Sequence, residues 1–258
     1  MILEMKYEVL GVRISAVNIN QTISLIDDLI SSGKKGYITV TGVHGIMESQ
    51  RNKEVLEAHN RSFLTVPDGM PLVWLGRWFG FKNVSRCYGP DLMLALMERS
   101  LKKDYRHFFY GGKPGIVQLL RTKMKEKYPG LKIAGVFTPP FRPLNPKEEE
   151  NLIEKVERVK PHIFWVGLST PKQELFMFHY LNELNVSLMI GVGAAFDFHA
   201  GQVKQAPKWI QRSGFEWLFR LLMDPKRLWK RYLRNNPEFL YLLFRESLIE
   251  KRQRGWRK

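Results

Sequence analysis

The stretch IFWVGLSTPKQE, residues 163–174, decides the fold that we expect for this chain. It opens on four apolar residues, 163–166, which predict a buried strand. Gly167 then turns the chain, and the hydroxyl pair at 169–170 stands directly before Pro171. A hydroxyl N-cap followed by proline in the first turn is typical of a helix start. The stretch therefore predicts a strand, a tight turn and a helix, in that order.

The first turn of this expected helix holds Lys172, Gln173 and Glu174. The backbone N–H groups there have no partner within the helix, and the helix dipole places partial positive charge at the same end. A phosphate or a sugar fits such a place. An ordinary strand-to-helix turn, with Lys172 and Glu174 simply exposed to water, explains the local pattern equally well.

Outward from this stretch, strand and helix patterns alternate at least five times up to about residue 200. Such alternation predicts an α/β protein with a Rossmann-like, mostly parallel sheet and helices on both faces. The strands are expected at residues 37–41, 62–66, 106–110, 132–137, 163–166 and 186–190. The helices are expected at residues 43–60, from about 70, at 89–101, at 148–159 and from the opening stretch to about 184.

Asp68 follows the strand expected at residues 62–66, within the turn PDGMP at 67–71. In open α/β sheets, ligands bind at the carboxyl ends of strands, so Asp68 is a candidate general base. A capping role for Asp68, at the helix that begins near Met70, is equally consistent with the spacing.

Two glycine-rich turns follow later strands. GGKPG at 111–115 suits the close approach of a nucleotide, but it is neither G-x-G-x-x-G nor a Walker motif, and a plain tight turn is the simpler explanation. GVGAAFDF at 191–198 carries small residues that admit a ligand close to the backbone or allow tight packing of strand on helix. The candidate contacts in these turns are Gly111, Gly112, Gly193 and Asp197.

Charge is the strongest compositional signal. The 258 residues carry a formal net charge of +16, and residues 201–258 hold 15 Lys and Arg against 5 Asp and Glu, so +10 of this net charge lies there. A basic end of this kind predicts an anionic partner, either a membrane surface or nucleic acid. The single cysteine, Cys87, excludes an internal disulfide and is typical of a reducing compartment.

The basic end also alternates aromatic and aliphatic residues with lysine and arginine, and it holds four of the seven tryptophans. Pro225 and Pro237 are expected to divide it into short helices. Basic amphipathic helices rich in tryptophan lie at membrane interfaces, and we favour this role over an apolar stripe packed on the core. Nucleic acid ranks third, because no nucleic-acid-binding motif accompanies the charge. We therefore expect an α/β domain at 1–201 and a basic helical appendage at 202–258.

Several classes of protein lack support in the sequence. The apolar runs are much shorter than the roughly 20 residues that cross a bilayer, and the first residues lack the pattern of a signal peptide. The six histidines show no H-x-x-x-H or H-E-x-x-H spacing, and no D-x-D motif is present, so we expect neither a bound metal nor another cofactor. No G-x-S-x-G elbow supports a serine hydrolase.

Five pieces of the sequence, taken in order, resemble the WecG/TagA/CpsF glycosyltransferases. The pieces are VPDG at 66–69, PKQE at 171–174, GVGAAFD at 191–197, AP at 206–207 and EWLFRL at 216–221. The resemblance covers almost the whole chain. It implies transfer of a hexose or N-acetylhexosamine from a UDP-sugar to a polyprenyl-diphosphate-linked saccharide, with inversion and without an essential metal. Such reactions build teichoic acid, enterobacterial common antigen, capsule or exopolysaccharide.

The resemblance also assigns roles to residues of this chain. Asp68 takes the position of the general base, Thr41 lies at the rim of the pocket and Gln173 contacts the substrate. The arginines that match those holding the acceptor diphosphate are Arg220, Arg227 and Arg231. Further expected substrate contacts are Lys172, Glu174, Gly111, Gly112, Gly193, Asp197 and His44. The implied location is cytoplasmic, at the inner face of the cell membrane, and members of the family self-associate.

One piece departs from the family pattern. After the first long strand, the teichoic-acid members read Thr-Pro-Asn, whereas this chain reads TGVHG at 41–45. The asparagine is missing, so glucose or another hexose is as good a candidate for the transferred sugar as N-acetylmannosamine. His44 either replaces the missing polar contact or is itself the base. The rival hypothesis is a non-catalytic peripheral membrane protein or nucleotide-binding adaptor with the same fold, which would need neither Asp68 nor Gln173.

Overall fold

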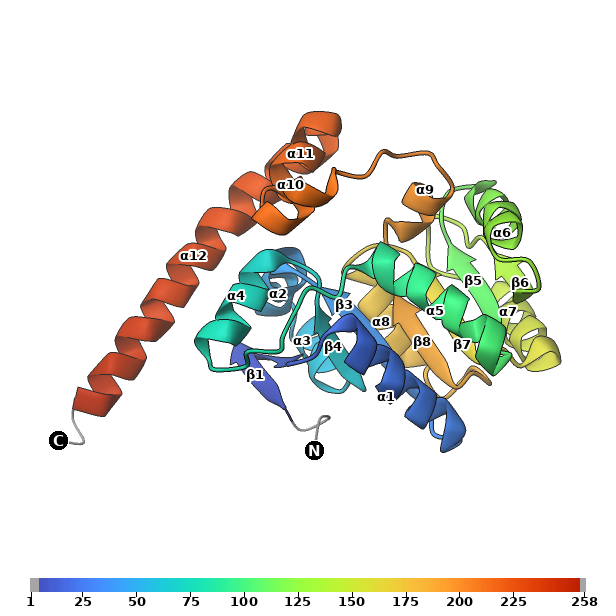
Figure 1. Ribbon diagram of the computed structural model, residues 1–258, viewed down its shortest axis with the longest axis horizontal. Helices are drawn as coiled ribbons and strands as arrows, with labels where there is room; N and C mark the ends of the chain where they lie inside the picture. Colours follow the sequence, from blue (N-terminus) through green and yellow to red (C-terminus); the bar gives the residue numbers. More distant parts are fainter. Residues whose placement is uncertain (1–4, 256–258) are drawn as a thin grey trace.

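The centre of the molecule is a sheet whose inner strands are buried on both faces. Among residues 5–255, which our computed structural model describes, six strands form one parallel sheet in the order β4-β3-β8-β7-β5-β6 (Figure 1). Strands covered on both faces are continuous apolar runs, as the fully buried start of β7 shows. The strands are β3 (Gly36–Thr41), β4 (Leu64–Pro67), β5 (Arg106–Gly111), β6 (Lys132–Phe137), β7 (Ile163–Gly167) and β8 (Leu188–Gly191). The predicted fold class is confirmed.

Two apolar cores cover the two faces of the sheet. Neighbouring strand residues point to opposite faces, so Trp165 of β7 enters one core and Phe164 enters the other. The Trp165 core is covered by α1 (Ile19–Ser31), α5 (Gly89–Lys103), α6 (Ile116–Lys127) and α9 (Ala195–His199). The Phe164 core is covered by α7 (Pro146–Val159) and α8 (Lys172–Tyr180).

A third apolar core lies beside the β4 edge of the sheet. It joins the antiparallel hairpin of β1 (Lys6–Val9) and β2 (Val12–Ser15) to α2 (Val43–Arg51) and α4 (Met70–Trp78). No strand or helix was expected before residue 36, so this hairpin and α1 are additions to the predicted fold.

The single helix that we predicted at residues 43–60 is wrong. The structure has two helices, α2 and α3 (Lys53–Asn60), with Asn52 between them in an extended conformation. The side chain of Asn52 accepts a hydrogen bond from the Glu54 N–H at 2.9 Å. Asparagine is a strong N-cap, and its cap begins a new helix at the point where α2 ends.

The basic end of the chain is helical and leans on the third core. It contains α10 (Lys208–Ser213), α11 (Glu216–Met223) and the 31-residue α12 (Pro225–Gly255), which runs along the outside of the molecule in Figure 1. Pro225 begins α12 as expected, but the predicted break at Pro237 is wrong, because α12 continues through it. Proline removes one helical hydrogen bond, and Pro237 and Leu233 are both exposed, so water can satisfy the freed carbonyl.

Within residues 5–255, we find no helix long and apolar enough to cross a membrane. The expected division of the chain at residue 201 stays a prediction.

Phe239 anchors α12, because it is 3% exposed and packs in the third core. We expect Phe239→Ala to weaken the docking of α12 by about 3–5 kcal/mol, the usual cost of emptying a buried phenylalanine site. Hydrogen exchange of the backbone amides at 225–247 measures this loss of protection. Leu240→Ala, at the exposed neighbouring position, is the control and should change protection little. Equal protection in the two variants would contradict the anchoring role.

Candidate active site

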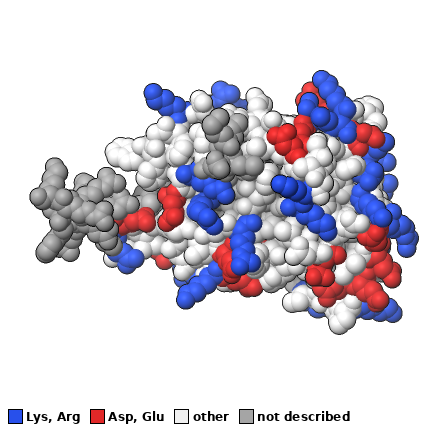
Figure 2. Space-filling view, turned by 90° about the horizontal axis from the view of Figure 1, so that it is seen from below, with Lys and Arg blue, Asp and Glu red and all other residues white. Residues whose placement is uncertain are grey.

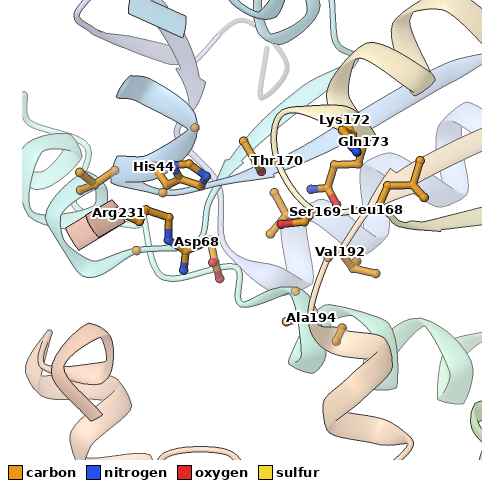
Figure 3. Close-up of a pocket in the computed structure, with 18 of the residues that line it drawn as sticks. His44, Asp68, Leu168, Ser169, Thr170, Lys172, Gln173, Val192, Ala194 and Arg231 are labelled. Atoms are coloured by element: carbon orange, nitrogen blue, oxygen red, sulfur yellow. The ribbon is translucent and has the colours of Figure 1, made fainter. Parts of the chain in front are cut away.

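A cavity of about 1240 Å³ lies where the strands of the sheet end. The turns that follow β3, β4, β7 and β8 line one side of it, and α11 and α12 line the other. Figure 3 shows His44, Asp68 and Arg231 on one flank, with Ser169 and Gln173 across from them. The carboxyl edge of an open α/β sheet is the usual place for a ligand.

The turn at the start of α8 differs from the predicted one. Pro171, after a cis peptide bond, stands at the N-cap position, and no side chain in the described structure caps the helix, so the predicted hydroxyl cap is wrong. The carbonyl of Ser169, whose φ is +67°, accepts the N–H of Gln173 at 3.1 Å instead. The hydroxyl of Thr170 donates to Glu174 Oε1 at 2.9 Å, so it is already occupied.

Gln173 is held by a buried carboxylate and aimed at the cavity. Its Nε2 donates to Glu174 Oε1 at 3.0 Å, and the two residues are 3% and 0% exposed. Its Oε1 is buried with no hydrogen-bond partner among the described residues, and a Cβ at Gly193 would lie 3.5 Å from this oxygen. A ligand donor can therefore bond to Gln173. The alternative that Glu174 is simply exposed to water is wrong; it supports Gln173 from behind.

Asp68 stands at the end of β4, where its N–H donates to the Thr41 carbonyl at 2.7 Å. Gly69 occupies the N-cap position of α4 without a side-chain cap, so the capping alternative for Asp68 is wrong. Burial raises the pKa of the Asp68 carboxyl, against the opposing charge of Arg86. A carboxylate with a raised pKa is a stronger base, which suits proton abstraction.

The cavity also contains groups that the sequence analysis missed. Arg86, Glu216 and Asn235 all line it: Arg86 pairs with Asp68 and Glu216, and Asn235 contacts His44. Glu216 lies within the EWLFRL piece, which was a signal for this residue. Nothing in the spacing marks Arg86 or Asn235, because their partners are far away in the sequence.

His44 is neutral in this site. Burial, followed by the charge of Arg231, lowers the pKa of its ring to about 4. Nδ1 lies 2.9 Å from the Asn235 amide nitrogen, which can only donate, so Nδ1 accepts and the ring proton belongs on Nε2. The lone pair that a base would use is therefore already engaged, which favours His44 as a polar contact.

The arginines assigned to a diphosphate all line the cavity. Arg220 and Arg231 reach it from α11 and α12, and Arg227 also pairs with Asp224 at 2.5 Å. Burial lowers the pKa of Arg231, which marks a cation drawn out of water. Three cations on one wall form a site suited to phosphate oxygens.

The other predicted contacts divide into two groups. Those that line the cavity are Lys172, Gly112, Gly193, Asp197 and His44. Thr41 lies outside the lining, because its buried hydroxyl faces His59 Nε2 at 3.1 Å. Gly111 also lies outside; its φ is +122°, and a Cβ there would meet the Gly167 carbonyl oxygen at 2.5 Å, so this glycine serves the close packing of β5 on β7.

The part of the chain that the structure describes contains no group of three or more His, Cys, Asp or Glu side chains that could hold a metal ion. The expectation that no cofactor is needed stays a prediction.

The sheet and its cavity define a Rossmann-like α/β protein, and the arginines of the cavity suit an anionic ligand. A sequence profile of the group described as the "Glycosyl transferase WecG/TagA/CpsF family" matches residues 7–253. The chain therefore belongs to this glycosyltransferase family, and the resemblance expected from the sequence is confirmed.

Two relatives of this chain carry one name between them. The chain is 30% identical, over 202 residues, to the N-acetylglucosaminyldiphosphoundecaprenol N-acetyl-beta-D-mannosaminyltransferase of Bacillus subtilis (strain 168); the match covers 78% of this chain and 76% of the relative. It is 30% identical, over 187 residues, to the protein of that name from Bacillus spizizenii (strain ATCC 23059 / NRRL B-14472 / W23), with 72% and 69% covered.

We expect the ring of His44 to stay neutral above about pH 5, because its pKa is lowered to about 4. Histidine ring NMR signals followed against pH measure this, and His44→Gln identifies the signal. Because the unfolded chain takes up the proton at about pH 6.5, the free energy of unfolding should fall between about pH 6.5 and 4, and fall less in the variant. A His44 midpoint near 6.5 would contradict the geometry described here.

Proposed function

We propose that this protein transfers a hexose or an N-acetylhexosamine, with inversion, from a UDP-sugar to a polyprenyl-diphosphate-linked saccharide during the synthesis of a cell-surface polysaccharide. The names of the two relatives support this acceptor and favour N-acetylmannosamine as the sugar. The TGVHG segment at 41–45 keeps glucose or another hexose as the alternative.

One observation carries the proposal: a partly buried carboxylate with a raised pKa shares a cavity with three arginines from another part of the chain. Transfer of a sugar to a hydroxyl needs a base for the hydroxyl proton and positive charge for the departing diphosphate. Asp68 supplies the base. Arg220, Arg227 and Arg231, which the resemblance assigns to the acceptor diphosphate, can supply charge to either diphosphate, and the first turn of α8, with Lys172, supplies more from the opposite wall.

In the proposed reaction, the acceptor hydroxyl attacks the anomeric carbon of the bound sugar while Asp68 takes the hydroxyl proton. The new bond joins the acceptor oxygen to the anomeric carbon, and the bond from that carbon to the UDP oxygen breaks. A single displacement of this kind inverts the anomeric centre. The Gln173 amide, with its open carbonyl, orients the sugar. We propose that the protein's own cations balance the diphosphates, so that no metal is essential.

The C-terminal helices support a place for the protein on the inner face of the cell membrane. Trp209, Leu222 and Leu233 are 72%, 73% and 65% exposed, and the exposed Lys226 and Lys230 lie among them. Apolar side chains beside cations suit an anionic lipid surface. On the face seen in Figure 2, acidic side chains gather most densely at the end away from these helices. A lipid-linked acceptor would then meet the cavity at the surface in which it is anchored.

Asp68→Asn keeps the shape of the side chain and removes the base, so we expect acceptor-dependent release of UDP to fall by roughly 10²–10⁴-fold. The assay offers a panel of UDP-sugars to the protein, with and without a short-chain polyprenyl-diphosphate sugar, in EDTA. Asp91→Asn, a change outside the main cavity, is the control and should keep most of the activity. Retained activity in Asp68→Asn would refute the assigned base, and no release from any donor by the unaltered protein would favour the adaptor hypothesis.

The membrane proposal predicts that charge placed on the exposed apolar side chains weakens binding to lipid. We expect the double change Leu222→Glu and Leu233→Glu to reduce co-sedimentation with anionic vesicles several-fold, because acidic groups are repelled there. Leu101→Glu is the matched control. Leu101 is 45% exposed and lies near the end of α5, shortly before β5 begins, at the end of the sheet away from the cavity. Equal loss in both variants would show that α11 and α12 are not the binding surface.

A further inference from the structure

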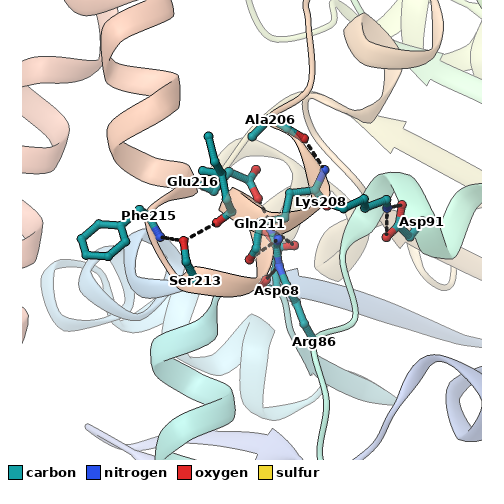
Figure 4. Close-up of polar contacts among 10 residues, drawn as sticks. Asp68, Arg86, Asp91, Ala206, Lys208, Gln211, Ser213, Phe215 and Glu216 are labelled. Atoms are coloured by element: carbon teal, nitrogen blue, oxygen red, sulfur yellow. Dashed lines mark hydrogen bonds and ion pairs between the residues drawn. The ribbon is translucent and has the colours of Figure 1, made fainter.

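The guanidinium of Arg86 lies between two carboxylates from distant parts of the chain (Figure 4). One carboxylate is Asp68, the proposed base after β4, and the other is Glu216, the first residue of α11. The side chains of Arg86, Glu216 and Asp68 are 15%, 11% and 31% exposed. Charges held this far from water depend strongly on their partners.

The two carboxylates do not share Arg86 equally. Its Nη1 lies 2.7 Å from Glu216 Oε2 and 3.4 Å from the Gln211 carbonyl, whereas its Nη2 lies 3.7 Å from Asp68 Oδ1. Nε donates to the backbone carbonyl of Asp68, and the guanidinium packs over the Tyr88 ring at 4.1 Å. Nη1 of Arg86 is thus in ion contact with Glu216, whereas the Asp68 carboxylate lies outside hydrogen-bond range of Nη2.

The surroundings of Asp68 show what this arrangement does. Burial raises the pKa of its carboxyl, Arg86 and Arg220 oppose this, and Glu216 adds to it. The titratable and charged groups that face Asp68 are Arg86, Cys87, Tyr88, Glu216 and Arg220. Of these groups, Arg86 carries the guanidinium that could close on the Asp68 carboxylate from its present position. Its Nη1 is in ion contact with Glu216.

We propose that Glu216 is a positioning residue that holds the Arg86 guanidinium away from the Asp68 carboxylate and so leaves this carboxylate free to accept a proton. The proposal rests on the proposed function, because it takes Asp68 as the base. Glu216 is the first residue of α11, one of the C-terminal helices. The C-terminal helices therefore prepare the base when they dock.

Glu216→Gln keeps the size of the side chain and removes its charge. Arg86 would then have Asp68 as its carboxylate partner and would close on it. A close arginine stabilises the ionised carboxylate, so the pKa of Asp68 should fall by about 1–3 pH units. Arg86→Gln should have the opposite effect, because it removes the cation and leaves the Glu216 charge unbalanced.

Carboxyl ¹³C NMR of the full-length protein, with aspartate labelled, measures the midpoint of Asp68 directly, and Asp68→Asn identifies its signal. We expect a lower midpoint in Glu216→Gln and a higher one in Arg86→Gln. In the Arg86→Gln background, Glu216→Gln should shift the midpoint clearly less than it does alone, because no guanidinium remains to move. Glu216→Asp, which keeps the charge, and Asp91→Asn, which weakens only the contact of Asp91 with Lys208 of α10, should stay close to the unaltered protein.

An unchanged midpoint in Glu216→Gln, or fully additive shifts in the double variant, would overturn the proposal. If Glu216→Gln fails to fold, an unraised midpoint in Arg86→Gln overturns it as well. In the transfer assay, the rising limb of kcat/KM against pH should move to lower pH in Glu216→Gln, since a base with a lower pKa is ionised earlier. A uniform loss without movement of the limb would show a structural role only. If the unaltered protein transfers no sugar, the proposed function fails, while the NMR titration still decides the role of Glu216.

Discussion

Parallel pairing of the strands is the constraint on which the rest of the structure depends. Because the strands of the main sheet run the same way, every turn from strand to helix meets at one edge. His44, Asp68 and Gln173 follow three different strands and are far apart in the sequence, yet they line one cavity. Side chains also pack closely against the strand ends: a Cβ at Gly191 would come within 3.1 Å of the Gln173 amide.

The second half of the cavity depends on contacts between α10, α11 and α12 and the α/β part. Phe239 supplies an apolar contact in the third core, and polar contacts add to it. His44 meets Asn235, Arg86 meets Glu216, and Arg51 pairs with Glu238. Burial supplies the binding energy without specificity, and the polar pairs fix how the helices sit. The site is therefore complete only when both parts are in place.

The sequence predicted the parts of the fold that local pattern determines. Buried strands bounded by glycine and proline were found because apolar runs show themselves within a few residues. The short hairpin before α1 was missed because it packs on residues that are distant in the sequence. Pro237 was wrongly taken as a break, because water can satisfy the carbonyl that it frees. Asp68 was found from its place after a strand, whereas Arg86 was not, since its partner Glu216 is 130 residues away. Thr41 was assigned by resemblance alone, and its hydroxyl faces His59 instead.

The two sides of the cavity come from separate stretches of the chain. We call the side formed by the turns after the strands the floor, and the side formed by the C-terminal helices the roof. The floor is complete before residue 200, and the roof begins with α10 at Lys208. Mutation can therefore remodel one of them and leave the other intact. Under the proposed roles, the floor holds the sugar and the roof holds the lipid diphosphate. A lineage could then change the sugar that it adds to a polymer while it keeps the carrier lipid that its membrane already makes.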